Sequence, residues 1–248
     1  MKSTISVIII TKNEGHDIRD CLNSVVWADE IIVLDSGSTD ETVLIAKEYT
    51  DKVYVSGDWQ GFGIQKNRVL AYASCDWVLS LDADERVSNE LCMEIQHAIQ
   101  SENVSVYKIP RLSCYCGKFI RHSGWWPDYV ARLFKRGNAA FSNDLVHEHL
   151  VYEGPASNLI EPLLHITYKD LDEVILKINH YSTSGAQNSY LKGKRGSLKL
   201  AIVHGVWAFV RTYIIRAGFL DGSEGFMLAV SNAEVTYYRY LKLFYLSK

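Results

Sequence analysis

The chain has 248 residues, of which 48% are hydrophobic and four are proline, and this composition is typical of a globular protein and excludes a disordered one. Its net charge of −3 hides an asymmetry, because residues 192–248 hold nine Lys or Arg and three Asp or Glu, a net +6 that leaves −9 for residues 1–191. The five cysteines form neither a CxxC pair nor a zinc-ligand spacing, which argues against a disulfide framework and indicates reduced thiols in a cytosolic protein.

Strand-like and helix-like segments alternate through the first hundred residues. An N-terminal apolar run, too short for a secretory signal, is the first predicted strand. Strands are predicted at 5–11, 30–35, 52–56 and 77–82, and helices at 16–26, 38–49, 61–74 and 89–100, with Ser38 and Ser88 as N-terminal caps. This alternation predicts an α/β fold with a doubly wound, mostly parallel sheet.

Polar side chains follow the predicted strands at the edge where parallel sheets bind ligands. Asp82 and Asp84 end the fourth strand, and because side chains alternate along a strand, both carboxylates are expected to point the same way. Two like charges held together need a compensating cation, although a solvated turn before the next helix also explains the pair. Further polar residues at this edge are Thr11, Asn13, Glu14 and Asp35.

Several segments resemble a known family. No GxGxxG and no GxxxxGK[ST] is present, which argues against a Rossmann dinucleotide site and a P-loop. The segments "SVIIITKNE", "EIIVLDSGSTDET", "GIQKNRVLAYASCDWVLSLDADE", "VARLFKRG", "VHEHL" and "PLLHITY" resemble the inverting family 2 glycosyltransferases of the GT-A fold, over residues 1–168. Within that family, "GWWPDYVARLF", "VHEHL" and "FVRTYIIRAGFLDGSEGF" resemble bacterial lipopolysaccharide core glucosyltransferases, which add β-linked glucose to an inner-core heptose.

The resemblance implies roles for individual residues of a UDP-sugar site. Thr11 and Asp35 are expected at the uridine, Lys66 and Asn67 near the nucleotide, Asp82 near the ribose or sugar, and Asp84 on a divalent ion, with Asn13 and Glu14 also in the substrate site. The ion is expected to be Mg²⁺ or Mn²⁺, because such ions take oxygen ligands from one or two carboxylates and from substrate phosphates. As a Lewis acid it would stabilise charge on the leaving diphosphate.

Inversion requires a general base that takes the proton of the attacking hydroxyl. Many family members carry a Glu-Asp pair for this step, and no such pair follows the Asp82 motif here. Two candidates remain: Glu148 in "VHEHL", which we favour, and Asp128, which follows Pro127 in an aromatic loop. The tryptophans Trp125 and Trp126 of that loop could stack on a sugar or serve as core or lid residues.

The region after Asp170 differs in character from the body of the chain. Residues 171–178 have the apolar spacing of a helix, and the longest charge-free run of the tail, between residues 199 and 211, is shorter than the roughly 20 apolar residues of a spanning helix. Interleaved basic and aromatic residues instead predict helices at a membrane interface, and packing on the catalytic domain or a dimer contact is the alternative. We therefore expect a GT-A domain at 1–168, with a nucleotide-sugar half at about 1–90 and an acceptor half at about 91–168, followed by a helical membrane-associating extension at 169–248.

Together these features predict an enzyme that transfers a hexose, glucose by resemblance, from a UDP-sugar to an inner-core heptose of lipopolysaccharide. The protein is expected to be cytoplasmic, attached peripherally to the inner membrane, and without a nucleic-acid partner. The open alternatives are transfer to another lipid-linked or capsular saccharide and a non-catalytic scaffold that binds nucleotide sugars. A nucleotidyltransferase is disfavoured because a Gly-rich phosphate loop is missing from the N-terminus.

Overall fold

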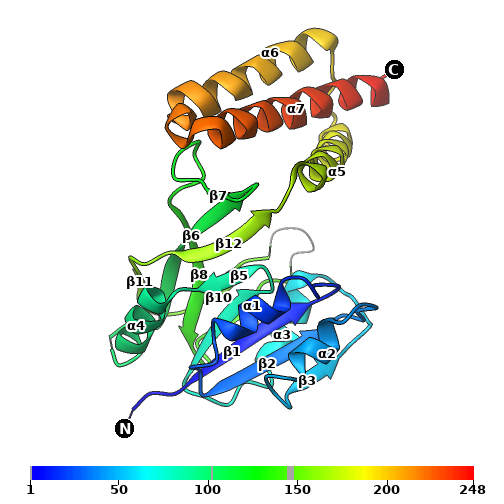
Figure 1. The fold of residues 1–248 in the computed structure, drawn as a ribbon. Helices are drawn as coiled ribbons and strands as arrows, with labels where there is room; N and C mark the ends of the chain where they lie inside the picture. The colour runs from blue at the N-terminus through cyan, green and yellow to red at the C-terminus, as the bar shows by residue number, and fades with distance from the viewer. Residues whose placement is uncertain (1, 102, 144–147) are drawn as a thin grey trace. The chain divides into compact units, whose positions relative to one another are not determined.

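The computed structural model describes residues 2–101, 103–143 and 148–248, and it separates into two compact units. The first, which we call the sheet unit, consists of Met1–Arg111 and Asp128–His165. The second, the helical unit, consists of Leu112–Pro127 and Ile166–Lys248. Figure 1 shows the ribbon of both units. The predicted boundaries at residues 90 and 168 stay predictions.

The strands are β1 (Ile5–Thr11), β2 (Glu30–Asp35), β3 (Val53–Val55), β4 (Trp77–Asp82), β5 (Glu85–Val87), β6 (Val106–Tyr115), β7 (Lys118–Phe119), β8 (Asp128–Lys135), β9 (Ala139–Phe141), β10 (Leu150–Tyr152), β11 (Ala156–Asn158) and β12 (Leu163–Tyr168). The helices are α1 (Ile18–Asn23), α2 (Thr42–Ala46), α3 (Phe62–Leu70), α4 (Asn89–Ala98), α5 (Leu171–Leu191), α6 (Leu198–Val210) and α7 (Gly222–Leu246). A π-helical turn (Arg211–Ile215) and a 3₁₀ turn (Gly218–Asp221) connect α6 to α7.

The main sheet has the strand order β3-β2-β1-β4-β8-β6-β12-β5. Strands β3, β2, β1 and β4 are parallel, whereas β8 runs antiparallel to β4 and β6 antiparallel to β8. The predicted α/β fold of GT-A type is confirmed, and the sheet is mixed because β8 runs opposite to the parallel strands. The register pairs Thr11 with Asp35 and Ile10 with Asp82, so three strands end together at one edge.

Both faces of β1, β2 and β4 are buried, as expected for parallel strands with nearly continuous apolar sequences. Alternate residues of β1 face opposite cores: Val7 belongs to a cluster that contains Ile18 of α1 and Leu91 of α4. Its neighbour Ile8 belongs to a second cluster with Val69 of α3. Figure 1 shows the short helices of the sheet unit beside these strands.

One of the two predicted helix caps is confirmed. The Ser88 hydroxyl accepts a hydrogen bond from the backbone N–H of Leu91, as an N-cap does. The prediction that Ser38 opens a helix was wrong, because α2 begins at Thr42 and the Ser38 side chain bonds Asp35 and the backbone N–H of Asn13 instead. A short polar side chain that can bond nearby loop groups competes with the helix in this way.

The helical unit has its own apolar core. Tyr115 and Ile120 pack with Val174 and Ile178 of α5 and with Leu228 of α7. The predicted apolar face of α5 is thus only partly buried, since its other two members, Leu171 and Ile175, are 51% and 61% exposed.

Helices α6 and α7 pack closely through small residues. A Cβ added at Gly205 would lie only 3.1 Å from the Cβ of Tyr237, and Ala201 is fully buried. Within the described residues, the segment Leu198–Ile215 is the one helical stretch long and apolar enough to cross a membrane by length and composition alone, with a mean hydropathy of 1.4. This departs from the prediction of no spanning run, because the helix continues past Lys199 and Arg211, which that prediction counted as breaks.

Candidate functional site

The site begins at the carboxyl ends of β1 and β2, where a buried hydroxyl stands without a partner. Thr11 is 5% exposed, and among the described residues its Oγ1 makes no hydrogen bond. A buried polar atom left unpaired is costly, so it indicates a group that a ligand would satisfy. Beside it, Asp35 is 1% exposed and accepts hydrogen bonds from the backbone N–H groups of Gly37 and Ser38, both at 2.8 Å.

The loops after β1 and β2 are tied to each other by residues that the sequence placed in the substrate site. Asn13 has a left-handed backbone, with φ of 56°, and its side-chain oxygen accepts from the backbone N–H of Thr39 at 2.8 Å. The backbone N–H of Glu14 donates to Thr42 Oγ1 at 2.8 Å. In the structure these two residues build the loop edge around Thr11 and Asp35, and their contact with substrate stays a prediction.

Asp82, at the end of β4, lies among cations of the protein itself. Lys66 Nζ is 3.0 Å from its Oδ1, and Arg132 donates to its Oδ2. Burial alone would raise the pKa of Asp82, but Arg132 and Lys66 overcome that effect and hold the pKa well below its usual range. Asp82 is therefore ionised at neutral pH, and two protein cations already offset part of the predicted repulsion with Asp84.

Arg132 connects Asp82 to a second carboxylate, Glu85. Its Nη2 lies 2.6 Å from Glu85 Oε1, and Glu85 is fully buried. Burial raises the pKa of Glu85, although the Arg132 charge opposes this shift. Arg132 Nε is buried without a hydrogen-bond partner among the described residues, as Thr11 Oγ1 is. Thr11 lies at the end of β1, and Arg132 contacts Asp82 at the end of β4, so both atoms without a partner belong to residues at this edge of the sheet.

Asp84, the predicted metal ligand, lies beside a histidine from β12. His165 Nε2 is 3.2 Å from Asp84 Oδ2. A carboxylate oxygen suits both Mn²⁺ and Mg²⁺, and an imidazole nitrogen suits Mn²⁺ better than the harder Mg²⁺. In the described part of the chain, no group of three or more His, Cys, Asp or Glu is arranged to hold a metal ion. The residues present fit an ion that takes its remaining ligands from substrate phosphates and water.

Of the two candidate bases, Glu148 is joined directly to the Asp82 network. Lys66 Nζ lies 3.1 Å from Glu148 Oε1 and so bridges Glu148 and Asp82. Asp128 instead pairs with Arg111, at 2.6 Å and 3.1 Å. Glu148 is the first described residue after the gap at 144–147.

A cavity of about 450 Å³ opens at this network within the sheet unit. Its lining includes Lys66, Asp82, Arg132 and Glu148, together with Arg111. Aromatic side chains, which suit the faces of sugar rings, also line it: Tyr129, Phe141 and Tyr152. The cavity therefore combines a donor-side carboxylate, a candidate base and apolar ring surfaces.

The other predicted site residues have structural partners. The Asn67 amide bonds the backbone of Phe141 in both directions, each at 2.8 Å, and so ties α3 to β9. In the helical unit, Trp125 stacks on Tyr168 with ring centroids 6.0 Å apart. Trp126 lies under the guanidinium of Arg121 at 5.4 Å. The stacking of Trp125 on Tyr168 favours a core role for Trp125. Contact of either tryptophan with a sugar stays a prediction.

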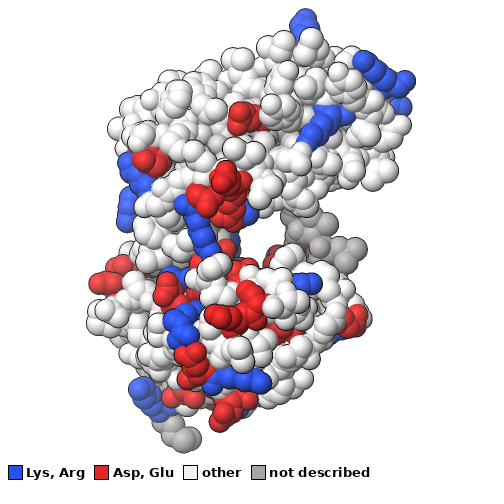
Figure 2. Space-filling view, turned by 45° about the vertical axis from the view of Figure 1, so that its right-hand side comes forward, with Lys and Arg blue, Asp and Glu red and all other residues white. Residues whose placement is uncertain are grey.

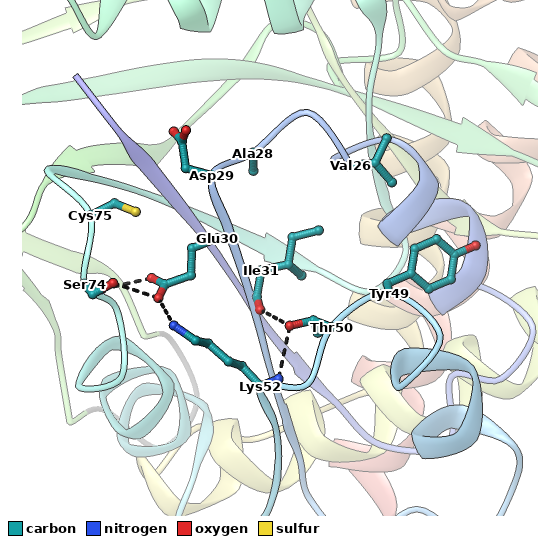
Figure 3. A pocket seen from close by; sticks show the side chains of 10 residues that line it. All are labelled: Val26, Ala28, Asp29, Glu30, Ile31, Tyr49, Thr50, Lys52, Ser74 and Cys75. Carbon is teal, nitrogen blue, oxygen red and sulfur yellow. Dashed lines mark hydrogen bonds and ion pairs between the residues drawn. The ribbon is translucent and has the colours of Figure 1, made fainter. Parts of the chain in front are cut away.

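A second cavity, of about 420 Å³, lies at the start of β2, opposite the edge that carries Asp35. Figure 3 shows Glu30 pointing to Ser74 and Lys52 there. Because Lys52 and Ser74 both donate hydrogen bonds to the Glu30 carboxylate, we assign these contacts to the stability of the fold and not to ligand binding.

The comparisons with known proteins agree with this geometry. The model of the family "Glycosyl transferase family 2" matches residues 6–150, which is more than half of the chain. This protein belongs to glycosyl transferase family 2. It is therefore a glycosyltransferase, and the predicted enzyme class is confirmed.

Relatives of this glycosyltransferase match along nearly its whole length. An uncharacterized glycosyltransferase of Rickettsia bellii is 32% identical, covering 96% of this chain and 85% of that protein. The lipopolysaccharide core biosynthesis glycosyltransferase LpsC of Rhizobium meliloti is 30% identical, covering 98% and 93%. The crystal structure of S. aureus TarS 1-349 superposes with a TM-score of 0.52 at 20% identity, covering 66% of this chain and 60% of that one, and it supports the fold alone.

Sequence reasoning missed Arg132, Glu85, Arg111 and His165. Arg132 lies in "VARLF" and His165 in "PLLHITY", which were both recognised as family segments without a role for either residue. Their partners Asp82 and Asp84 are 50 and 81 positions away in the chain. No local pattern predicts such contacts, because only the reversal of β8 and β12 creates them.

Proposed function

We propose that this glycosyltransferase transfers a hexose from a UDP-sugar, with inversion, to a saccharide of lipopolysaccharide. The observation that carries the proposal is Lys66, which joins Asp82 at the strand edge to Glu148 in one cavity. The lipopolysaccharide acceptor is supported by the likeness to LpsC over 98% of the chain. Glucose as the sugar and an inner-core heptose as the acceptor rest on the sequence resemblance.

The donor is held by the edge formed at the ends of β1, β2 and β4. The unpaired Thr11 hydroxyl offers a hydrogen bond to the nucleotide, and the Asp35 loop places backbone groups beside it. Asp84 and His165 would hold a divalent ion, which when bound stabilises the negative charge of the leaving diphosphate. Asp82, kept ionised by Lys66 and Arg132, is suited to accept hydrogen bonds from sugar or ribose hydroxyls.

Glu148 is proposed as the base on the acceptor side. Its carboxylate accepts the proton of the attacking hydroxyl, which then forms the new bond to the anomeric carbon as the bond to the diphosphate breaks. Lys66 holds this carboxylate at a fixed place relative to Asp82, which reduces the freedom that would be lost in reaching the reactive geometry. Asp128, paired with Arg111, is the second candidate.

The same proposal places the enzyme at the cytoplasmic face of the inner membrane, where a lipid-linked acceptor is found. It is supported by the basic tail and by the exposed apolar side chains of α6, among them Ile202, Val206 and Trp207. On the face shown in Figure 2, the helical unit is mostly white, with few charged groups, while the sheet unit carries many of both signs.

The test is release of UDP from a panel of UDP-hexoses with Mg²⁺, Mn²⁺ or EDTA, in the presence of truncated lipopolysaccharide, followed by NMR of the linkage. We expect UDP-glucose to be used, a β-linked product, and loss of transfer both in EDTA and in Asp84→Ala. Undiminished transfer in EDTA would overturn the metal requirement. UDP-sugar binding without turnover on any saccharide would support the scaffold alternative, and turnover only on other saccharides would overturn the acceptor.

A further inference from the structure

The helical unit contains a cavity of its own, of about 430 Å³, where the end of α5 and the start of α6 meet α7. Its lining includes three basic residues, Lys194, Arg195 and Arg239. The other lining residues are Ser189, Leu200, His204, Tyr240 and Leu243. It holds none of the residues assigned to sugar transfer.

The positive charge in this cavity is not neutralised. No Asp or Glu lines it, and within the described chain none of Lys194, Arg195 and Arg239 makes an ion pair. Other lysines of the same unit are paired, as Lys118 is with Glu224 at 3.4 Å. Three like charges around one cavity repel each other, and a bound anion would relieve that repulsion.

The two guanidinium groups are held in place by aromatic rings. Arg195 lies 5.2 Å from the ring centre of Tyr190, and Arg239 lies 5.0 Å from that of Tyr240. The Tyr240 ring also stacks on the His204 ring, at 4.2 Å between centroids and with an interplanar angle of 4°. Guanidinium groups match phosphate oxygens two at a time.

A close contact with α5 also positions Arg239. A Cβ added at Gly185 would lie 2.8 Å from Arg239 Cδ, so the aliphatic part of Arg239 lies directly against the α5 backbone. Lys194 and Arg195 are exposed and lie on the loop between α5 and α6, whereas Arg239 lies on α7 and is half-buried. A loop and a helix together supply the three charges that line the cavity.

Exposed apolar side chains lie on the two helices that the cavity-lining loop connects. Leu191 is 84% exposed, and on the first two turns of α6 Leu198, Ile202 and Val203 are 51%, 50% and 54% exposed. A soluble phosphate would gain nothing from these side chains, whereas acyl chains beside a phosphate headgroup would cover them. The combination of cations without ion-pair partners and exposed apolar side chains on the adjoining helices indicates a lipid.

We propose that the Lys194, Arg195 and Arg239 cavity binds the phosphate headgroup of an anionic phospholipid. The inference goes beyond the proposed transferase function, which requires only general attraction to a membrane. It also assigns the attraction to the membrane to one defined cavity.

The test is flotation of the full-length protein with vesicles of phosphatidylcholine alone or mixed with phosphatidylglycerol. The variant carries Lys194→Gln, Arg195→Gln and Arg239→Gln. A matched control carries Lys192→Gln, Lys199→Gln and Lys248→Gln, which removes the same charge from exposed residues outside the cavity. Circular dichroism and UDP binding check that both variants fold.

We expect the cavity variant to lose about a hundredfold in affinity for the anionic vesicles, since each basic residue near a membrane surface contributes about fivefold. The control should lose at least tenfold less than the cavity variant. Equal losses would overturn the site, because attraction would then be diffuse. Inorganic phosphate or a single-stranded oligonucleotide that binds the cavity as tightly as the vesicles do would overturn the lipid assignment.

These results are independent of the proposed transferase function. UDP release with a water-soluble saccharide acceptor should be the same in the cavity variant and the wild type. If no UDP is released by either protein while the vesicle result holds, the transferase proposal fails and the lipid site stands.

Discussion

At the residue scale, the candidate site is a chain of alternating charges: Glu148, Lys66, Asp82, Arg132 and Glu85. Each inner member touches two partners of opposite sign, at distances from 2.6 to 3.1 Å where the contacts are of ordinary length. A buried ion pair of this kind adds little stability over an apolar replacement of both partners, but removal of one partner leaves an uncompensated buried charge. The network therefore holds functional carboxylates in place more than it stabilises the fold.

Arg132→Met should lower the free energy of unfolding by about 3–5 kcal/mol, because Asp82 and the fully buried Glu85 lose their shared cation. Urea denaturation at neutral pH measures this change. Arg136→Met is the matched control, since Arg136 is an exposed arginine directly after β8, the strand that carries Arg132, and its effect should stay within about 0.5 kcal/mol. Equal effects of the two substitutions would contradict the network.

The Glu30 carboxylate leads to a separate prediction of how the stability of the fold depends on pH. Burial alone would raise its pKa, but hydrogen bonds from Lys52, Ser6 and Ser74 overcome this and lower the pKa from 4.5 to about 2. A carboxylate with a depressed pKa stabilises the fold fully above the unfolded value, and that stabilisation is lost as pH falls from about 4.5 to about 2. Figure 3 shows the Lys52 and Ser74 contacts.

Glu30→Gln should accordingly lower stability by up to about 3 kcal/mol at neutral pH, and the difference from the wild type should shrink below about pH 4.5. Thermal melts across this pH range measure the effect. Glu48→Gln serves as control, because Glu48 pairs with Arg19 on the surface, where such pairs contribute about 1 kcal/mol or less. A difference that is constant with pH would show that the Glu30 carboxylate is not the cause.

At the scale of elements, helix α3 sets the position of the loop that carries Glu148. A Cβ added at Gly63 would lie 1.8 Å from the carbonyl oxygen of Ser142 and 3.5 Å from the Glu148 Cβ. The Asn67 amide ties the next turn of α3 to β9. The missing side chain of Gly63 thus allows the close approach that brings Glu148 to Lys66.

Gly63→Ala should therefore displace the backbone at Ser142 and at Glu148 and reduce turnover by tenfold or more, as about 1 Å of misplacement can do. UDP affinity, which depends on strand ends elsewhere, should change little. Gly57→Ala is the control, because a Cβ there meets nothing within 4 Å. A Gly63→Ala enzyme with wild-type turnover would show that this approach does not position Glu148.

The elements themselves could largely be predicted from the sequence, and their contacts could not. The apolar runs of β1, β2 and β4 are buried on both faces, so their composition alone predicts covered parallel strands. The helix at Ser38 was predicted too early, because the Asp35 loop takes the Ser38 hydroxyl. Arg132 and His165 reach Asp82 and Asp84 only through the turns of β8 and β12, which leave no periodic signal in the chain.

At the scale of the molecule, the helical unit is a folded body and not a simple tail. Asp221, 4% exposed, accepts hydrogen bonds from the backbone N–H groups of Arg121 and His122, and Leu228 completes the core around Tyr115. Removal of the chain after about residue 192 would delete both groups. Point substitutions on exposed positions are therefore the sounder way to separate membrane contact from folding.

The central claim is that sugar transfer occurs in the cavity where Lys66 joins Asp82 to Glu148. The most direct measurement is the turnover of Glu148→Gln beside its affinity for the UDP-sugar, with Asp128→Asn as the matched variant. Glutamine keeps the shape and the hydrogen bonding of Glu148 but cannot take the proton, so turnover should fall by about 10²-fold or more while UDP-sugar affinity stays nearly unchanged. Wild-type turnover in Glu148→Gln, with the loss appearing in Asp128→Asn instead, would contradict the account.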